Sequence, residues 1–207
     1  PLQKDIGRFL ETSSGDIMVQ AQRSQAKSTI TACFAAFFLI HMPTGRVLIV
    51  SAGGKQANEI STLVTKLILH MPELSCLRPD RSAGDRVSVE AFDIHNSLKG
   101  FDKSPSVACT GITANLQGKR ADLLIADDVE SEKNSRTQTM RELLMTWTKD
   151  FSSIVQSGRI IYLGTPQSVL SIYNTLPARG VTVRIWPGRF PTKEQLKNYG
   201  SLLAPAI

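Results

Sequence analysis

Short apolar runs alternate along the chain with longer stretches in which apolar residues recur at helical spacing. Such runs predict strands, and the clearest lie at residues 17–20, 46–52, 106–111, 121–126, 159–163 and 181–186. The run at 46–52 is almost continuously apolar, which is typical of a strand covered on both faces. Strands that alternate with helices in this way predict an α/β fold with a mostly parallel sheet.

The helical stretches differ in how much of their surface is apolar. Residues 27–42 are apolar almost all round, which predicts a helix buried in a larger domain, whereas residues 57–68 are apolar on one side only. Ser135 and Gln138 have the spacing of a capping box, and a helical stripe follows from Met140 to Ile154. The segment 72–105 is less regular, with one alternating strand at 87–92. No repeat or linker divides the chain, so residues 1–207 are expected to form a single domain.

The segment AQRSQAKS at residues 21–28 lies between the first strand and the buried helix. Its spacing is that of a phosphate-binding loop, GxxxxGK followed by Ser or Thr, with alanine at both glycine positions. In such a loop backbone N–H groups cradle the phosphates, the lysine adds positive charge, and the hydroxyl binds Mg²⁺. Lys27 and Ser28 are assigned these two roles. The alternative is an ordinary strand-to-helix turn capped by Ser24. The predicted nucleotide-binding residues of this segment are Ala21, Gln22, Arg23, Ser24, Gln25, Ala26, Lys27, Ser28 and Thr29.

An acidic cluster follows the apolar run LLIA at residues 123–126. In P-loop enzymes an acid at this place supports Mg²⁺, and a neighbouring carboxylate orients the attacking water. Asp127 is the candidate for the metal. Asp128 is the candidate catalytic acid by position, but aspartate is shorter than the usual glutamate, so Glu130 stays open. The alternative is that these acids merely occupy a solvated turn.

The segment YLGTPQ at residues 162–167 is a buried strand that ends in a sharp polar turn. Gly164 and Pro166 are ordinary turn residues. Thr165 and Gln167 are predicted to lie beside the γ-phosphate and to sense its loss. All three motifs fall at the carboxyl ends of strands, where open α/β sheets bind ligands.

Composition narrows the partners of the chain. Lys and Arg total 24 against 18 Asp and Glu, and the resulting net charge of +6 favours a polyanionic partner. Candidates to face DNA phosphates are Lys99, Lys103 and Lys119, although scattered lysines usually form solvated surface. Three cysteines without a CxxC pair make a zinc site or a disulfide scaffold unexpected. The longest apolar stretch, residues 32–42, is too short to span a bilayer, so no membrane association is expected.

Taken together, these motifs resemble those of the ATPase domain of phage terminase large subunits, most closely of the short-tailed podovirus branch. In that branch the phosphate loop carries an arginine at its third position and often AKS in place of GKS, as Arg23 and residues 26–28 do here. The resemblance implies a RecA-like P-loop NTPase fold with helices on both faces of the sheet. It continues through GKRAD (118–122), IADDVE (125–130), YLGTPQ (162–167), IWP (185–187) and LAP (203–205).

The resemblance also implies roles for single residues. Gln3, just before a helix expected at residues 4–10, is similar to a glutamine that contacts adenine, with a solvated polar residue as the alternative. Arg23 is similar to a loop arginine that senses the γ-phosphate, with a surface ion pair as the alternative. Thr165 is similar to a residue that couples hydrolysis to subdomain motion. Arg120 is a weaker candidate for an arginine that acts across a subunit boundary, against a structural salt bridge or a DNA contact.

The implied function is that of an ATPase motor that uses ATP and Mg²⁺ to drive double-stranded DNA into a viral procapsid. The implied partners are DNA, a portal protein, a small terminase subunit and further copies in a ring, with a monomer expected in isolation. The implied location is the host cell cytoplasm and, transiently, the procapsid portal. A nuclease domain is expected to lie outside these residues, which makes the chain a fragment.

Three alternatives remain open at this point. One is a helicase-like DNA-dependent ATPase, although such enzymes usually need a second RecA-like half that is not found in these 207 residues. Another is a nucleotide-binding assembly module without hydrolysis, suggested by the alanines of the loop and the short acid. The last is a basic DNA-binding α/β domain that never binds nucleotide.

Overall fold

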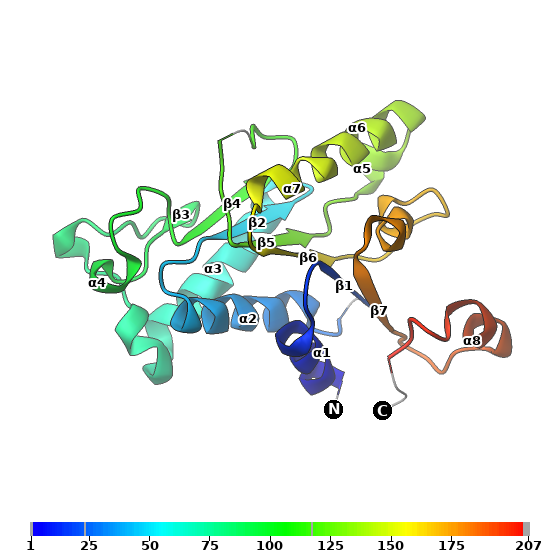
Figure 1. Ribbon diagram of the computed structural model, residues 1–207, viewed down its shortest axis with the longest axis horizontal. Helices are drawn as coiled ribbons and strands as arrows, with labels where there is room; N and C mark the ends of the chain where they lie inside the picture. The colour runs from blue at the N-terminus through cyan, green and yellow to red at the C-terminus, as the bar shows by residue number, and fades with distance from the viewer. Residues whose placement is uncertain (1, 23, 117, 205–207) are drawn as a thin grey trace.

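Seven strands form one sheet in the computed structural model, which describes residues 2–22, 24–116 and 118–204 (Figure 1). The strand order is β3-β4-β2-β5-β6-β1-β7, and all neighbouring strands are parallel except β3, which runs antiparallel to β4. The carboxyl ends of the parallel strands therefore share one edge. The bounds are β1 Ile17–Ala21, β2 Val47–Ser51, β3 Ala91–Phe92, β4 Val107–Gly111, β5 Leu123–Asp127, β6 Arg159–Leu163 and β7 Thr182–Trp186.

The helices lie on both faces of the sheet, as predicted (Figure 1). One core joins α1, α2 and α3 to residues such as Val19 and Ile125, and the other joins α6 and α7 to residues such as Met18 and Ala126. Successive strand residues thus alternate between two cores, because side chains on a strand point to opposite faces. The bounds are α1 Leu2–Thr12, α2 Lys27–His41, α3 Gly54–His70, α4 Asn96–Lys99, α5 Glu132–Ser135, α6 Gln138–Lys149, α7 Phe151–Ile154 and α8 Lys193–Tyr199.

Four predicted elements differ from the structure. The strand expected at 87–92 is reduced to Ala91–Phe92, because the chain turns at Ser88, whose hydroxyl accepts from Ala91 N at 3.1 Å. Ser135 does not cap the next helix: its hydroxyl donates to Ser131 O, while the Thr137 side chain caps α6 at Met140 N. The apolar stripe is divided at Asp150 into α6 and α7. The α2 helix, expected to be buried all round, leaves Cys33 and Phe37 exposed, because the sheet and neighbouring helices cover its other sides.

The first helix is attached to the last strand at the carboxyl edge of the sheet. The indole Nε1 of Trp186 donates to Asp5 Oδ2 at 2.8 Å, and the ring of Phe9 meets the Trp186 ring edge-on. Trp186 is also the register partner of Ala21 on β1. The first turn of α1 is therefore held near the end of β1. Among the described residues no helix combines the length and the apolar character needed to cross a membrane.

Candidate nucleotide site

The three predicted motifs meet at the carboxyl edge of the sheet. Strand β6 lies between β1 and β5, so the ends of these strands, at Ala21, Leu163 and Asp127, are neighbours. The segment after β1, the turn after β5 and the turn after β6 consequently surround one place. The chain order of the three motifs gives no hint of this adjacency, which arises from the crossover connections of the parallel sheet.

The loop after β1 has the backbone shape of an anion-binding loop. Ser24 and Ala26 have φ of +69° and +60°, which lie in the left-handed region. Gln22 N donates to the side chain of Gln25 at 2.8 Å, which closes the loop on itself. The predicted Arg23 lies outside the described residues. Ser24 does not cap α2, contrary to the ordinary-turn alternative: the N-cap is Ala26, and it makes no side-chain capping bond. The first amides of α2 thus point toward the loop without a side-chain cap, as anion binding requires.

Lys27 places a buried ammonium between the first and third motifs. Its side chain is 8% exposed, and Nζ donates to Ala21 O at 2.6 Å and to Thr165 Oγ1 at 3.4 Å. The Thr165 hydroxyl also lies 3.4 Å from Ala21 O. The lysine and the threonine therefore converge on the end of β1, and an arriving phosphate would offer both of them new partners.

Ser28 and Asp127 join the loop to the acidic strand end. Ser28 Oγ lies 3.3 Å and 3.5 Å from the two carboxylate oxygens of Asp127. Burial raises the pKa of Asp127 to about 6, and the charge of Asp128 adds to this, while Lys27 and the Ser28 hydroxyl oppose it. A cation bound close to Asp127, in addition to the Lys27 ammonium, would lower this pKa and favour the ionised form of the Asp127 carboxylate.

These two groups fit a magnesium ion that also takes phosphate oxygens. Mg²⁺ in such sites is held by one or two protein oxygens, waters and substrate phosphates, not by a full protein cage. No group of three or more His, Cys, Asp or Glu side chains that could hold a metal ion is found within residues 2–22, 24–116 and 118–204. A hydroxyl beside one carboxylate is the donor set that such a shared ion needs.

Asp128 and Glu130 have opposite environments. Asp128 is exposed, with φ of +41°, and its N–H donates to Leu163 O at 2.9 Å. Glu130 is only 6% exposed, and its Oε2 accepts from Ser171 Oγ at 2.9 Å and from Ile172 N at 2.8 Å. The carboxylate of Glu130 is thus occupied in holding the segment that follows the third motif, whereas that of Asp128 is accessible.

Tyr173, which is not among the residues predicted from the sequence, connects the second and third motifs. A Cβ on Gly164 would overlap the ring of Tyr173, so a side chain there would have to displace this buried ring. The Tyr173 hydroxyl accepts from Glu130 N at 3.3 Å, and burial raises the pKa of this phenol far above its usual value. Gln167 is exposed and donates to Thr165 O at 3.1 Å, within its own turn. No local sequence signal marks Tyr173, because its partners are distant in the chain.

The remaining predicted residues lie around or away from this site. Gln3 lies within the first turn of α1, not before the helix as expected, and is exposed; the Asp5–Trp186 bond holds this turn near the end of β1. Thr29 is exposed on α2. Arg120 is exposed in the loop that enters β5, at the edge opposite Asp127, so it does not reach the loop of its own chain. Arg120 makes no ion pair with another described residue, so the alternative of a structural salt bridge has no support there.

Lys99, a candidate DNA contact, is instead engaged in a structural ion pair. Its Nζ lies 2.8 Å from Asp93 Oδ1, and its side chain is 11% exposed. Arg86 binds the same carboxylate at 2.7 Å, and the two cations lower the pKa of Asp93 to about 2, against an opposing effect of burial. Lys99 therefore has little surface left to offer to DNA.

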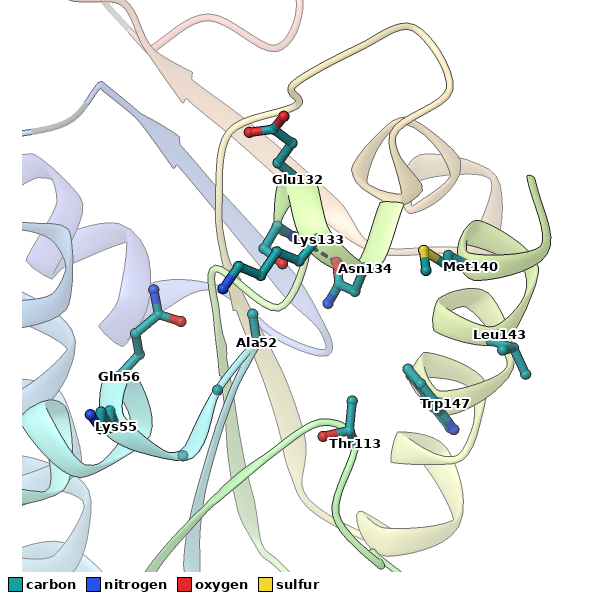
Figure 2. Close-up of a pocket in the computed structure, with 13 residues that line it drawn as sticks. Ala52, Lys55, Gln56, Thr113, Glu132, Lys133, Asn134, Met140, Leu143 and Trp147 are labelled. Atoms are coloured by element: carbon teal, nitrogen blue, oxygen red, sulfur yellow. Dashed lines mark hydrogen bonds between the residues drawn. The ribbon is translucent and has the colours of Figure 1, made fainter. Parts of the chain in front are cut away.

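A separate pocket of about 850 Å³ opens beside the site, over the ends of β2 and β4 (Figure 2). Lys55 borders it from the first turn of α3, Thr113 from the segment after β4, Lys133 from α5, and Met140 and Trp147 from α6. Among the described residues, none of those predicted to bind nucleotide lines this pocket.

Comparison with known proteins agrees with the arrangement of the motifs. The chain is 40% identical over 213 aligned residues to the terminase large subunit of Enterobacteria phage T3, with 99% of this chain and 35% of that protein covered. The chain thus spans about a third of the length of this curated relative. No protein-family model matches the chain.

Solved structures of similar fold come from the same kind of protein. A point mutant of the large terminase ATPase domain of Thermus phage P74-26 superposes with a TM-score of 0.57 at 17% identity, covering 99% of this chain and 77% of that one. The large terminase of a thermophilic bacteriophage gives a TM-score of 0.52 at 9% identity, covering 95% of this chain and 48% of that one. At these identities the similarity shows the fold alone. The resemblance seen in the sequence is confirmed, and the chain is homologous to phage terminase large subunits and has the RecA-like α/β fold of their ATPase domains.

Proposed function

We propose that this chain is the ATP-hydrolysing motor domain of a viral DNA-packaging terminase. The observation that carries the proposal is the contact between Ser28 Oγ and Asp127, with the Lys27 ammonium beside the same strand ends. A hydroxyl, a carboxylate and a lysine at the carboxyl edge of a parallel sheet are the groups that a triphosphate with its metal requires. The homology to a terminase large subunit supports the same assignment.

Each group has a role in binding. Lys27 and the uncapped amides at the start of α2 hold the β- and γ-phosphates, and the left-handed residues Ser24 and Ala26 turn the loop around them. Ser28 and Asp127 are the residues that would hold Mg²⁺. When bound, this ion neutralises the negative charge that develops on the phosphate oxygens.

Asp128 is the proposed group that orients the attacking water. It is exposed at the edge where the γ-phosphate would lie, whereas the Glu130 carboxylate already accepts two hydrogen bonds. Thr165 lies 3.4 Å from the lysine Nζ, which supports a role in detecting the loss of the γ-phosphate. The same role in detecting the γ-phosphate is proposed for Arg23 and Gln167. Gln3 is proposed to contact adenine, and Arg120 is proposed to act on the neighbouring subunit.

The polymer that the motor is proposed to move is double-stranded DNA, and the net charge of +6 favours binding to this polyanion. The proposed partners are a portal protein, a small terminase subunit and further copies of the chain in a ring at the procapsid portal in the host cytoplasm. Because Arg120 lies at the edge opposite the site of its own chain, a role in hydrolysis would require a neighbouring subunit. Isolated chains are then expected to be monomers of low activity.

The test is phosphate release from ATP across a wide range of protein concentration, with and without duplex DNA. We expect release to rise faster than linearly with concentration and to vanish in Lys27→Ala, which should also lose nucleotide binding. Lys133→Ala is the matched control, because it removes an exposed lysine from the adjacent pocket. Equal activity of the parent and Lys27→Ala would contradict the site. Nucleotide binding without any release would favour the assembly module.

A further inference from the structure

Ser51 carries a buried hydroxyl that the proposed function has not used. It is the last residue of β2, and its side chain is fully buried. Its backbone is satisfied, since Ser51 O accepts from Ile112 N at 2.8 Å. Its Oγ, however, has no hydrogen-bond partner in the part of the chain that the structure describes. Buried polar groups almost always have a partner, so this hydroxyl requires an explanation.

The position of Ser51 in the sheet places it beside Asp127. Strand β2 is the neighbour of β5, and Ser51 and Asp127 are register partners. Both follow by two residues a side chain of the same core, Ile49 on β2 and Ile125 on β5. Because side chains alternate between faces, Ser51 and Asp127 point to the same face, the one that α2 and Ser28 cover.

The carboxylate of Asp127 has room for a second donor. An ionised carboxylate can accept about four hydrogen bonds. The contacts that Ser28 Oγ makes with it are long, at 3.3 Å and 3.5 Å. Ser28 approaches from α2, while Ser51 flanks the carboxylate from the neighbouring strand. A serine hydroxyl moves between staggered rotamers without moving the backbone, so a change of χ1 suffices to turn it toward a neighbour.

We propose that Ser51 is a positioning residue for the metal site: its hydroxyl donates a hydrogen bond to the Asp127 carboxylate when that carboxylate holds the Mg²⁺ of a bound nucleotide. This proposal rests on the proposed function. With Ser28 on one side of the Asp127 carboxylate and Ser51 on the other, hydrogen bonds from two directions fix the orientation of both carboxylate oxygens. Partners of metal ligands typically change metal affinity by 10- to 100-fold when they are removed.

The test compares Ser51→Ala with the matched control Thr65→Val. Thr65, on α3, has the other serine or threonine hydroxyl that is buried without a partner among the described residues, and it lies on a different element from the site. The measurement is the Mg²⁺ concentration that gives half of the rise in Tm produced by adenylyl imidodiphosphate. We expect this concentration to increase about tenfold in Ser51→Ala and to stay at the parental value in Thr65→Val. Without nucleotide, neither variant should lower Tm, because neither loses a hydrogen bond.

The outcomes separate this proposal from the proposed function. A parental Mg²⁺ midpoint in Ser51→Ala overturns the role of Ser51 alone, whereas a parent chain without any Mg²⁺-dependent rise in Tm overturns both proposals. A second variant, Ser51→Cys, keeps the branching of the side chain with a somewhat larger terminal atom and weakens the donor. It should keep the nucleotide-free Tm and raise the midpoint, and a parental midpoint there would also count against a hydrogen bond from Ser51.

Discussion

The segments at the ends of β1 and β5 contribute to the same candidate site in different ways. At the end of β1 the loop depends on backbone shape, with two left-handed residues and uncapped amides at the start of α2. At the end of β5 three acids depend on side-chain environment: Asp127 is buried, Asp128 is exposed, and Glu130 is buried and hydrogen-bonded. Backbone shape tolerates any residue that can adopt it. A carboxylate, in contrast, takes its role from its neighbours, so three similar acids within four positions are not interchangeable.

The largest effect is expected from Asp128→Asn, which tests whether the three acids have different roles. Asparagine tolerates positive φ, so the turn should keep its shape. If Asp128 orients the water, phosphate release should fall by about 100-fold or more, as for other catalytic acids and bases. Nucleotide affinity and Tm should stay at the parental values. Unchanged turnover would place the catalytic acid elsewhere.

Glu130→Gln should affect stability in place of chemistry. One oxygen of the buried Glu130 carboxylate accepts from Ser171 Oγ and Ile172 N, and the amide oxygen of glutamine can accept the same two bonds but lacks the negative charge that strengthens them. Hydrogen bonds to charged groups contribute about 1.5–3 kcal/mol, so the free energy of unfolding in urea should fall by about 2 kcal/mol. The folded variant should still bind nucleotide. A variant with parental stability and no turnover would reverse the roles of Glu130 and Asp128.

The pH dependence of stability should report on Asp127. Burial raises its pKa from 3.8 to about 6, so the folded chain binds a proton that the unfolded chain has lost between these values. Its contribution to the free energy of unfolding is therefore present below pH 3.8 and lost as pH rises through about 6, by on the order of 3 kcal/mol.

Asp127→Asn removes this titration and is the direct check. Without Mg²⁺, urea unfolding should show the variant to be more stable than the parent at about pH 7, with the gap closing toward about pH 4. Mg²⁺-dependent nucleotide stabilisation should be absent in the variant. In the parent it should weaken below about pH 6, because the metal needs the ionised carboxylate. A constant gap across this range would mean that the variant acts through packing.

The smallest effects should distinguish the two alanines of the loop. Ala26 has φ of +60°, which costs an alanine about 1–2 kcal/mol, and this exceeds the flexibility penalty of glycine. Ala26→Gly should therefore stabilise the chain by up to about 1 kcal/mol. Ala21 lies in β1, where glycine brings no relief, so Ala21→Gly should destabilise it by about 1 kcal/mol. Unfolding in urea measures both, and effects of equal sign would argue against a loop defined by its backbone shape.

The sheet could be predicted closely because its strands are buried apolar runs. The runs at 121–126 and 181–186, for example, correspond to Leu123–Asp127 and Thr182–Trp186. The segment between β1 and α2 also lies where the local pattern predicts a turn from strand to helix, whereas its binding of phosphate stays a prediction. Helix α8 was missed although a signal exists: Thr192 and Gln195 form a capping box before it.

The environments of the acids could not be predicted in the same way. Asp128 and Glu130 remained alternatives in the sequence because the bond that distinguishes them joins Glu130 to Ser171, 41 residues away. The unpartnered hydroxyl of Ser51 depends likewise on the pairing of β2 with β5. Such features arise only when distant segments pack together, and no local pattern of residue types records them.

The packing of Tyr173 against Gly164 has a mechanical consequence. The ring fills the space where a side chain at Gly164 would be, and the phenol oxygen holds the backbone of Glu130. A displacement of the turn that carries Thr165 must therefore push on the ring and, through it, on the turn that carries Asp128. Tyr173 thus links the two turns, by packing of its ring at Gly164 and by the hydrogen bond of 3.3 Å from Glu130 N to its hydroxyl.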